Sequence, residues 1–411
     1  MALPLSLEGL LAQIRLKPLL GIHLLQAPVL VLELLEPLHH RGVHAAKPRA
    51  PLNGMDYLPT YTTAVSSLSG DYLMANVHYL GIDLAKNVFQ LCGLSRSGRV
   101  VYKTRLKRDE LLRSVAQLET CTIGVEACTG AFYWQRELES LGHTVRVISP
   151  QFVKPFISGQ KNDYNDARGI AVALMQPTMK FVPSKTPEQQ DIQALHRARQ
   201  RIVNHRTATA CQIRGLLLDR GIPIPKAITR LRRAIPLLLE DATNGLSLRM
   251  RRTIQELYEL LTSLDERVLF FDKEIEAVFK ENDACQRVAK IKGVGPKTAT
   301  AIVAAIGDGK DFKNGRHFAA WLGLVPRQHS SGDRQVLMNI TKRGDQHLRT
   351  LLVHGARSVL RTAKPDASLF DKWVDQLRER RGSNKATVAV ANKNARIIWS
   401  ILRNKTSYVC S

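Results

Sequence analysis

The sequence lacks closely spaced cysteines and long apolar runs. Its six cysteines include no C-x-x-C pair, which argues against a zinc site or a disulfide framework and favours reduced thiols in a cytosolic protein. No apolar run of about 18 residues is uninterrupted, so no transmembrane helix is expected. The leucine-rich start also lacks the basic region and the cleavage site of a signal peptide. We therefore expect a cytoplasmic protein that has no membrane partner.

Acidic residues are also in short supply. The chain has 60 Lys and Arg against 36 Asp and Glu, a formal charge of +24. Residues 1–73 contain five residues of each sign, so the whole excess lies in residues 74–411. A surplus of this size favours a polyanionic partner, most simply nucleic acid, over a basic protein without a specific partner.

The first 73 residues differ in composition from the rest. They are rich in Leu and Pro, whereas Met74 opens the well-patterned sequence MANVHYLGIDLAK. We expect residues 1–73 to be an extension with little or no fold, and the natural start to be Met74. The alternative is an accessory pair of helices.

The next part of the chain alternates strands and helices. Three β-rich runs, YLGIDLA, VFQLCGLS and VVYKTRL, come first, with a turn at RSG between the last two. A helix over about 107–118, a strand CTIGVEAC, a helix over about 130–141 and a strand TVRVIS follow, and helical sequence resumes near Asn162. This order predicts an α/β domain of the RNase H type over residues 74–185.

The middle of the chain, residues 186–281, is predicted to be a helical connector. Two long stretches carry apolar residues at helical spacing and could form an antiparallel hairpin or an oligomerising coiled coil. The first stretch also carries a basic face, which either binds nucleic acid or is simply solvated. Its members are Arg197, Arg199, Arg201, Arg206 and Arg214. Residues 282–411 are expected to form a C-terminal domain.

Four carboxylates are candidates for a metal site. Asp83 lies within a strand of apolar residues, and Glu126 lies near the end of another such strand. In an RNase H-like sheet these two strands are neighbours, so both side chains can reach one point. Asp163 and Asp166, in KNDYNDA, share one helix face.

Each of these acids alone is more typical of a cap or a turn, and capping is the favoured role for Asp163 by itself. Together they would repel one another unless a divalent cation neutralised them. Ligands that offer only oxygen suit Mg²⁺ or Mn²⁺. Two such ions can stabilise the attacking and leaving oxygens of a phosphodiester displacement.

The segment IKGVGPKTATAIVAAIGD has the helix-hairpin-helix pattern. Gly293 and Gly295 allow a tight turn whose backbone N–H groups can approach a phosphate. Lys292 and Lys297 add positive charge. The alternative is a turn that only packs two helices together.

A third segment, GLVPRQHSSGDRQVLMNITKRGDQHLRTLLVHGAR, places Ser330 and Ser331 in a glycine-containing loop among cations. A serine can attack a phosphodiester when a base or a metal activates it. No Gly-x-Ser-x-Gly elbow is present, and the residues alone favour an ordinary serine turn. The candidate nucleic-acid contacts of this segment are Arg327, Lys342, Arg343 and Arg349.

Taken together, these motifs resemble a DEDD-type transposase of the insertion sequence 110 family, in its 1111 subgroup. The resemblance covers about Val77 to Tyr408 and rests on an ordered set of motifs: GIDLAKNVFQ, GVEACTGAFYW, KNDYNDARGIA, IKGVGPKTA, GLVPRQHSSG and ITKRGDQHLRTLLVHGAR. It implies a RuvC-like N-terminal domain of RNase H fold, a helical connector and a C-terminal transposase domain. Residues 1–73 match nothing in the family.

The resemblance also implies roles for single residues. Asp83, Glu126, Asp163 and Asp166 would form the acidic tetrad that binds Mg²⁺ or Mn²⁺. A catalytic serine would form a covalent phosphoserine link to DNA, and Ser331 is placed in this role with Ser330 as the alternative.

The implied partners are donor and target DNA, a structured guide RNA made by the element itself, and further copies of the chain in a dimer or tetramer. The implied location is the bacterial cytoplasm, in association with the nucleoid.

Three other functions remain open from the sequence. A RuvC-like nuclease would cut DNA with metal-activated water and would not use the serine. An ATPase of the actin or sugar-kinase type shares the sheet and a GID strand, but its further glycine-rich phosphate loops are missing from the expected places. An inactive nucleic-acid-binding relic would process no DNA at all.

Overall fold

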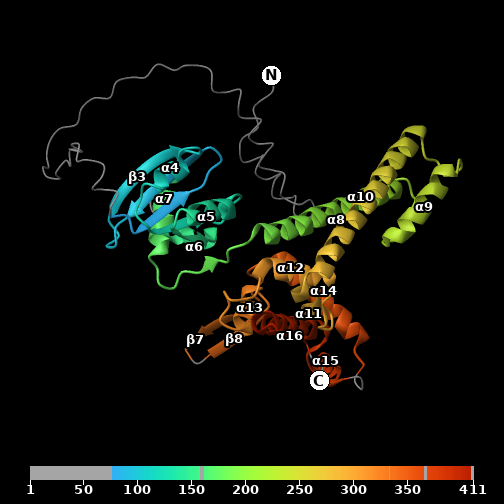
Figure 1. The fold of residues 1–411 in the computed structure, drawn as a ribbon. Helices are drawn as coiled ribbons and strands as arrows, with labels where there is room; N and C mark the ends of the chain where they lie inside the picture. The colour runs from blue at the N-terminus through green and yellow to red at the C-terminus, as the bar shows by residue number, and fades with distance from the viewer. Residues whose placement is uncertain (1–75, 158–161, 333, 365–367, 409–411) are drawn as a thin grey trace, which may run out of the picture. The chain divides into compact units, whose positions relative to one another are not determined.

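The computed structural model describes residues 76–157, 162–332, 334–364 and 368–408 (Figure 1). The predicted extension over residues 1–73 lies outside the described residues. Among the helices of the described part, none is both long enough and apolar enough to cross a membrane.

The first part of the chain forms a six-stranded mixed sheet in the order β3-β2-β1-β4-β5-β6. Strands β1, β2 and β3 are antiparallel, while β1 and β4, and then β4 and β5, are parallel pairs. The strands are β1 (Tyr79–Asp83), β2 (Val88–Leu94), β3 (Val100–Lys107), β4 (Thr122–Glu126), β5 (Thr144–Ile148) and β6 (Phe181–Val182). The predicted order of strands and helices is confirmed, and the short strand β6 is an addition to it.

Side chains alternate between the two faces of a sheet, and helices cover both faces of this one. Phe89 and Leu91 of β2 belong to the core under α4 (Leu111–Val115) and α5 (Ala131–Ser140). Cys92 belongs to a separate core under α7 (Asp163–Leu174). Two short helical turns, α6 (Pro150–Val153) and η3 (Lys154–Phe156), precede α7.

The helix predicted over about 107–118 is shorter in the structure and spans only Leu111–Val115. Lys107 is paired with Val88 at the end of β3. The backbone of Lys107 is therefore extended, and the helix begins only after the turn that follows.

Three helices follow the sheet: α8 (Pro187–Leu218), α9 (Ile228–Glu240) and α10 (Leu248–Glu281). A capping box of Thr186 and Gln189 starts α8. Ion pairs join Arg199 of α8 to Asp272 of α10, and Arg206 to Asp265. The residue number rises along α8 as it falls along α10, so the two helices pack as an antiparallel hairpin, which is one of the two arrangements that the sequence left open. Helix α9 lies between the two long helices in sequence and shares their core.

The C-terminal part is mainly helical and shares one apolar core. Asn282 ends α10, and its side chain caps α11. Between α13 and α14 the chain forms a two-stranded hairpin whose strand β7 is exposed at every residue. The elements are α11 (Asp283–Ala289), α12 (Pro296–Ile306), α13 (Gly315–Trp321), β7 (Pro326–Ser331), β8 (Arg334–Ile340), α14 (Gln346–Thr362), α15 (Leu369–Arg381) and α16 (Ser383–Asn404).

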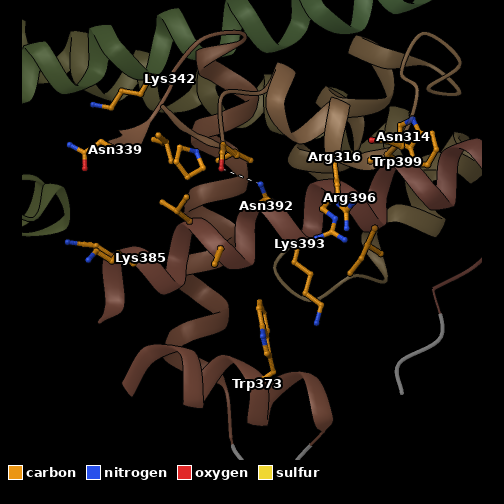
Figure 2. A pocket seen from close by; sticks show the side chains of 18 of the residues that line it. Asn314, Arg316, Asn339, Lys342, Trp373, Lys385, Asn392, Lys393, Arg396 and Trp399 are labelled. Atoms are coloured by element: carbon orange, nitrogen blue, oxygen red, sulfur yellow. Dashed lines mark hydrogen bonds between the residues drawn. The ribbon is translucent and has the colours of Figure 1, made fainter. Parts of the chain in front are cut away.

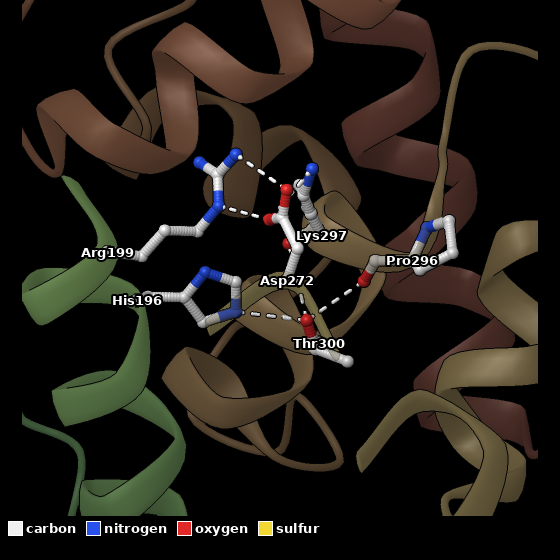
Figure 3. A network of polar contacts seen from close by, with 6 residues as sticks. All are labelled: His196, Arg199, Asp272, Pro296, Lys297 and Thr300. Carbon is white, nitrogen blue, oxygen red and sulfur yellow. Dashed lines mark hydrogen bonds and ion pairs between the residues drawn. The ribbon is translucent and has the colours of Figure 1, made fainter. Parts of the chain in front are cut away.

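A polar network joins the first half of α8 to α10 and α12 (Figure 3). His196 donates from Nε2 to the hydroxyl of Thr300 at 2.9 Å, and Thr300 in turn donates to the carbonyl of Pro296. Asp272 accepts from both Arg199 and Lys297. Burial lowers the pKa of His196 to about 4, so this side chain is neutral and bound within the fold.

Candidate functional site

Two of the four candidate carboxylates end neighbouring strands of the sheet. Strands β1 and β4 are parallel, with Ile82 opposite Val125. Asp83 and Glu126 are the next residues, and each is the last residue of its strand. The pairing confirms that the two strands are neighbours, and the two side chains therefore leave the same edge of the sheet.

A pair of glycines allows α7 to lie directly on these strands. Gly81 is opposite Gly124 in the β1–β4 register. A Cβ atom at Gly81 would lie 2.1 Å from the carbonyl oxygen of Ala167, and one at Gly124 would lie 2.8 Å from the side chain of Leu174. No side chain fits at either position, so the helix backbone approaches the sheet closely.

This close approach determines where the other two carboxylates lie. Side chains two residues apart share a strand face, so Asp83 is on the same face as Gly81, beneath α7. Asp166 directly precedes Ala167, which contacts that glycine. The first turn of α7 therefore meets the ends of β1 and β4. The sequence patterns did not identify the glycine pair, although both glycines stand two residues before a candidate carboxylate.

The start of α7 corrects one prediction about Asp163. The N-cap is Asn162, whose side-chain oxygen accepts from the backbone N–H of Asn165 at 2.8 Å. Asp163 is the first residue of the helix, and its favoured role as the cap was wrong. Asp163 and Asp166 both lie in the first turn, where the helix dipole favours negative charge.

The carboxylates form a compact group. Asp83, Asp163 and Asp166 each offer one oxygen, and these oxygens all lie within 4.8 Å of one another. Burial, followed by the charges of Asp166, Asp163 and Glu126, raises the pKa of Asp83 to about 6. Burial and then Asp166 also raise the pKa of Glu126, which lies beside the group of three rather than within it.

The donors at this centre are chemically uniform. Three close carboxylates with mutual repulsion fit a hard divalent cation that prefers oxygen ligands. Cys128 lies close enough for Glu126 and Asp83 to add to the effect of burial, and its thiol pKa is raised. The thiol therefore stays protonated at neutral pH in the metal-free chain.

The two candidate serines lie in a strand, so the predicted loop was wrong at this point. Ser330 pairs with Gln335, and Ser331, the last residue of β7, pairs with Arg334. Successive strand residues point to opposite faces, so the two hydroxyls face different surroundings. Ser330 accepts from the side-chain amide of Gln328 at 2.9 Å. Ser331 is exposed, and its hydroxyl has no hydrogen-bond partner within the described part of the chain.

Three of the predicted nucleic-acid contacts have partners inside the protein. Lys292 pairs with the buried carboxylate of Asp371, and Lys297 pairs with Asp272 at 3.0 Å. The guanidinium of Arg349 donates to the backbone carbonyl of Leu322 at 3.0 Å. These side chains stabilise the C-terminal fold. Arg327, Lys342 and Arg343 are exposed.

The turn in the predicted helix-hairpin-helix packs closely on another helix. Gly293 has a φ of +83°, and a Cβ atom there would lie 2.7 Å from the carbonyl oxygen of Gly355 in α14. Close packing is therefore one reason for this glycine. Gly295 precedes α12, and a Cβ atom there would meet nothing within 4 Å.

The basic face of α8 divides into two kinds of arginine. Arg199 and Arg206 form the ion pairs with α10, and Arg214 donates to the backbone carbonyls of Pro225 and Lys226. Arg197 and Arg201 are exposed.

A mixed sheet that ends in clustered carboxylates is typical of enzymes that act on phosphodiesters, and comparison with known proteins identifies the kind. A transposase model of the DEDD type of IS110 matches residues 80–221. A second model, described as "Transposase IS116/IS110/IS902 family", matches residues 285–371.

Similar proteins carry the same description. "Transposase for insertion sequence element IS1111A" of Coxiella burnetii (strain RSA 493 / Nine Mile phase I) is 45% identical over 337 residues, which cover 82% of this chain and 93% of that protein. A "Probable family 20 transposase" of Pseudomonas aeruginosa is 45% identical over 337 residues, with 81% and 99% covered. "Transposase for insertion sequence element IS1328" of Yersinia enterocolitica is 35% identical over 335 residues, with 82% and 99% covered.

The chain belongs to the IS116/IS110/IS902 family of transposases. Its N-terminal domain has the RNase H-like fold that the DEDD model implies. It is an enzyme whose partner is DNA.

Proposed function

We propose that this transposase cleaves and exchanges DNA strands with two groups of residues: a metal-binding tetrad and a serine nucleophile, in the manner of the 1111 subgroup. The tetrad is Asp83, Glu126, Asp163 and Asp166, and the nucleophile is Ser331. The observation that carries the proposal is the meeting of carboxylates from β1 and α7, with one oxygen each within 4.8 Å.

Asp83, Asp163 and Asp166 would hold Mg²⁺ or Mn²⁺, with Glu126 beside them. When bound, the metal would supply positive charge for the oxygens of a phosphodiester under attack. The raised pKa of Asp83, at about 6, is a consequence of burial and like charges, and the same repulsion favours a cation at this point. The protein itself would position the carboxylates, at the end of strand β1 and in the first turn of the capped helix α7.

The serine step is a transesterification. The Ser331 hydroxyl oxygen attacks the phosphorus of one phosphodiester, a DNA hydroxyl leaves with the serine proton, and a phosphoserine ester remains. A hydroxyl of another DNA strand then attacks this ester, which joins the strands and restores serine. Bonds of the same kind form and break, so the reaction needs no energy source. Both serines are exposed, and Ser331 is favoured over Ser330 because its hydroxyl does not accept from Gln328.

The helix-hairpin-helix segment and the exposed cations Arg327, Lys342 and Arg343 are proposed to contact nucleic acid. The formal charge of +24 is consistent with binding of DNA together with a structured guide RNA, in which base pairing would select the DNA sequence. The active form would contain two or four copies of the chain.

A second candidate function is supported by the metal centre alone. The described residues place no histidine or carboxylate in a hydrogen bond with Ser331. In a nuclease, water would attack the phosphodiester at the carboxylate centre, and the serine would have no chemical role.

One experiment separates the two candidates. The full chain is incubated with MgCl₂ and a DNA duplex that carries the terminus of the insertion element, and denaturing electrophoresis then detects protein linked to DNA. The serine mechanism predicts a covalent adduct with the unchanged chain and with Ser330→Ala, and none with Ser331→Ala. Cleavage by Ser331→Ala at the rate of the unchanged chain, with no adduct from either, would establish the nuclease instead.

A further inference from the structure

A groove of about 1240 Å³ lies in the C-terminal part of the chain, on one side of α16 (Figure 2). One face of α16 forms its floor, and the start of α13, the base of the β7–β8 hairpin and Trp373 of α15 form its walls. Asn392 donates to the carbonyl of Leu324, and the indole of Trp399 donates to the carbonyl of Gly309. These bonds fix the floor to the neighbouring segments.

The groove has apolar and aromatic walls, and its polar lining consists of cations, amides and one serine, with no acidic residue. The cations are Arg316, Lys342, Lys385, Lys393 and Arg396, and the amides are Asn314, Asn339, Asn384 and Asn392. Residues 382–411, which include all of α16, contain no Asp or Glu. Within the described residues, none of the five cations takes part in an ion pair. The positive charge of this surface is therefore not neutralised by the protein.

Three of these cations lie in the same part of the groove. Arg316, Lys393 and Arg396 gather in one part of the groove, while Lys342 and Lys385 lie in another (Figure 2). The ammonium of Lys393 lies 4.1 Å from the ring centroid of Trp373, so an aromatic face supports it in place of a carboxylate. Burial and then the charge of Arg396 lower the pKa of Lys393. An anion bound here would relieve this repulsion.

We propose that the α16 groove binds the phosphate backbone of a DNA strand beside the cleavage point. Nucleic acid fits this surface because separated phosphates can meet separated cations, and the asparagine amides can donate to phosphate or base oxygens. Lys385 and Arg396 are 11 residues apart on α16, or about 16 Å along its axis. That length spans about five steps of 3.4 Å along one DNA strand.

The position of the hairpin favours DNA as the occupant. Pro326 and Ile340 form a pair at the base of the hairpin and line the groove, whereas Ser331 and Arg334 form the pair at its tip. Strand β7 thus extends about 17 Å from the groove to Ser331. A strand lying in the groove can continue along the hairpin toward that serine. This position relative to the cleavage point rests on the proposed role of Ser331, whereas the binding of DNA by the groove does not.

The test measures binding without cleavage. Fluorescence anisotropy follows a labelled DNA duplex carrying the element terminus, and an RNA duplex of the same sequence, over a range of salt concentrations. The main variant is Lys385→Gln/Arg396→Gln, because both side chains are exposed. The control is Arg361→Gln/Lys372→Gln, which removes the same charge from exposed residues of α14 and α15 outside the groove.

We expect the main variant to bind DNA roughly tenfold more weakly, and its slope of log Kd against log salt to decrease by about 2. The control should change neither. A second variant, Arg316→Gln/Lys393→Met, should show the same loss of DNA binding. The same loss in two independent variants would show that it does not come from a folding defect in the first. Unchanged DNA binding, an equal loss in the control, or a loss confined to RNA would overturn the proposal. Ser331→Ala should bind DNA normally, so failure of the serine mechanism and failure of the groove give different results.

Discussion

Gly81 and Gly124 face each other across the parallel pair β1–β4, and together they form the surface on which α7 lies. Each glycine stands two residues before a carboxylate that ends its strand. The contact between sheet and helix therefore also determines the distance from Asp83 to Asp163 and Asp166.

Enlarging either glycine should separate the two halves of the metal centre. In Gly81→Ala the new Cβ atom would lie 2.1 Å from a helix carbonyl, and overpacking of this kind costs about 1–3 kcal/mol. We expect a lower melting temperature and loss of the stabilisation that MnCl₂ gives to the unchanged chain. The control is Gly215→Ala in α8, where a Cβ atom meets nothing within 4 Å; it should keep the metal response and gain up to about 1 kcal/mol. A full metal response in Gly81→Ala would contradict this role of the glycine.

The general fold was predictable from the sequence because its signals are local. The β-rich runs in 79–107 and the turn at RSG indicate the antiparallel strands, and the helical spacing of 186–281 indicates the long helices, although it left open whether they form a hairpin or a coiled coil. The end of β3 was less predictable, because Lys107 is held in the strand by its pairing with Val88. That pairing depends on tertiary structure and leaves no local pattern.

The metal-free centre should have a characteristic pH dependence. The pKa of Asp83 is raised from 3.8 to about 6 in the folded chain. The folded state therefore binds more protons than the unfolded state between these values, so the contribution of Asp83 to stability is lost as pH rises through about 6.

In EDTA, the melting temperature of Asp83→Asn relative to the unchanged chain should consequently increase from about pH 4 to pH 7. The lowered pKa of His196 makes stability rise with pH, which is opposite to the effect of Asp83. Both proteins contain His196, so the difference between their melting temperatures removes its effect. MgCl₂ should stabilise the unchanged chain more at pH 7.5 than at pH 5. A constant difference between the two proteins across this range would show that burial and the neighbouring carboxylates do not raise the pKa of Asp83.

Asp166→Asn should abolish strand cleavage and leave DNA binding intact. The substitution removes a charge from the metal centre and keeps the size of the side chain. Cleavage of a DNA duplex carrying the element terminus and anisotropy with the same duplex measure the two properties. Equal loss of cleavage and binding would count against a purely metal-binding role.

The arginines of α8 should behave as two classes. Arg197→Gln/Arg201→Gln should weaken nucleic-acid binding and reduce its salt slope by up to about 2, because both side chains are exposed. Arg199→Gln should instead lower the melting temperature, because Asp272 loses one of its two cationic partners. If Arg197→Gln/Arg201→Gln leaves the salt slope unchanged, those two side chains form only a solvated surface.

The proposed metal site was only partly predictable, and the α16 groove was not. The order of Asp83, Glu126, Asp163 and Asp166 identified the carboxylates, but their meeting depends on the close contact of α7 with two glycines. Lys297 looked available for nucleic acid because its partner Asp272 is 25 residues away in sequence. The groove gathers residues from α13, β8, α15 and α16, and no local pattern in the sequence reports that they share one surface.

Mn²⁺ binding measures whether β1 and α7 together build one metal site. Electron paramagnetic resonance of free Mn²⁺ during titration measures binding to the unchanged chain, to Asp83→Asn and to Asp109→Asn, a control at an exposed residue of the same domain. We expect saturable binding that Asp83→Asn abolishes and Asp109→Asn preserves. Equal Mn²⁺ affinity in all three proteins would contradict it.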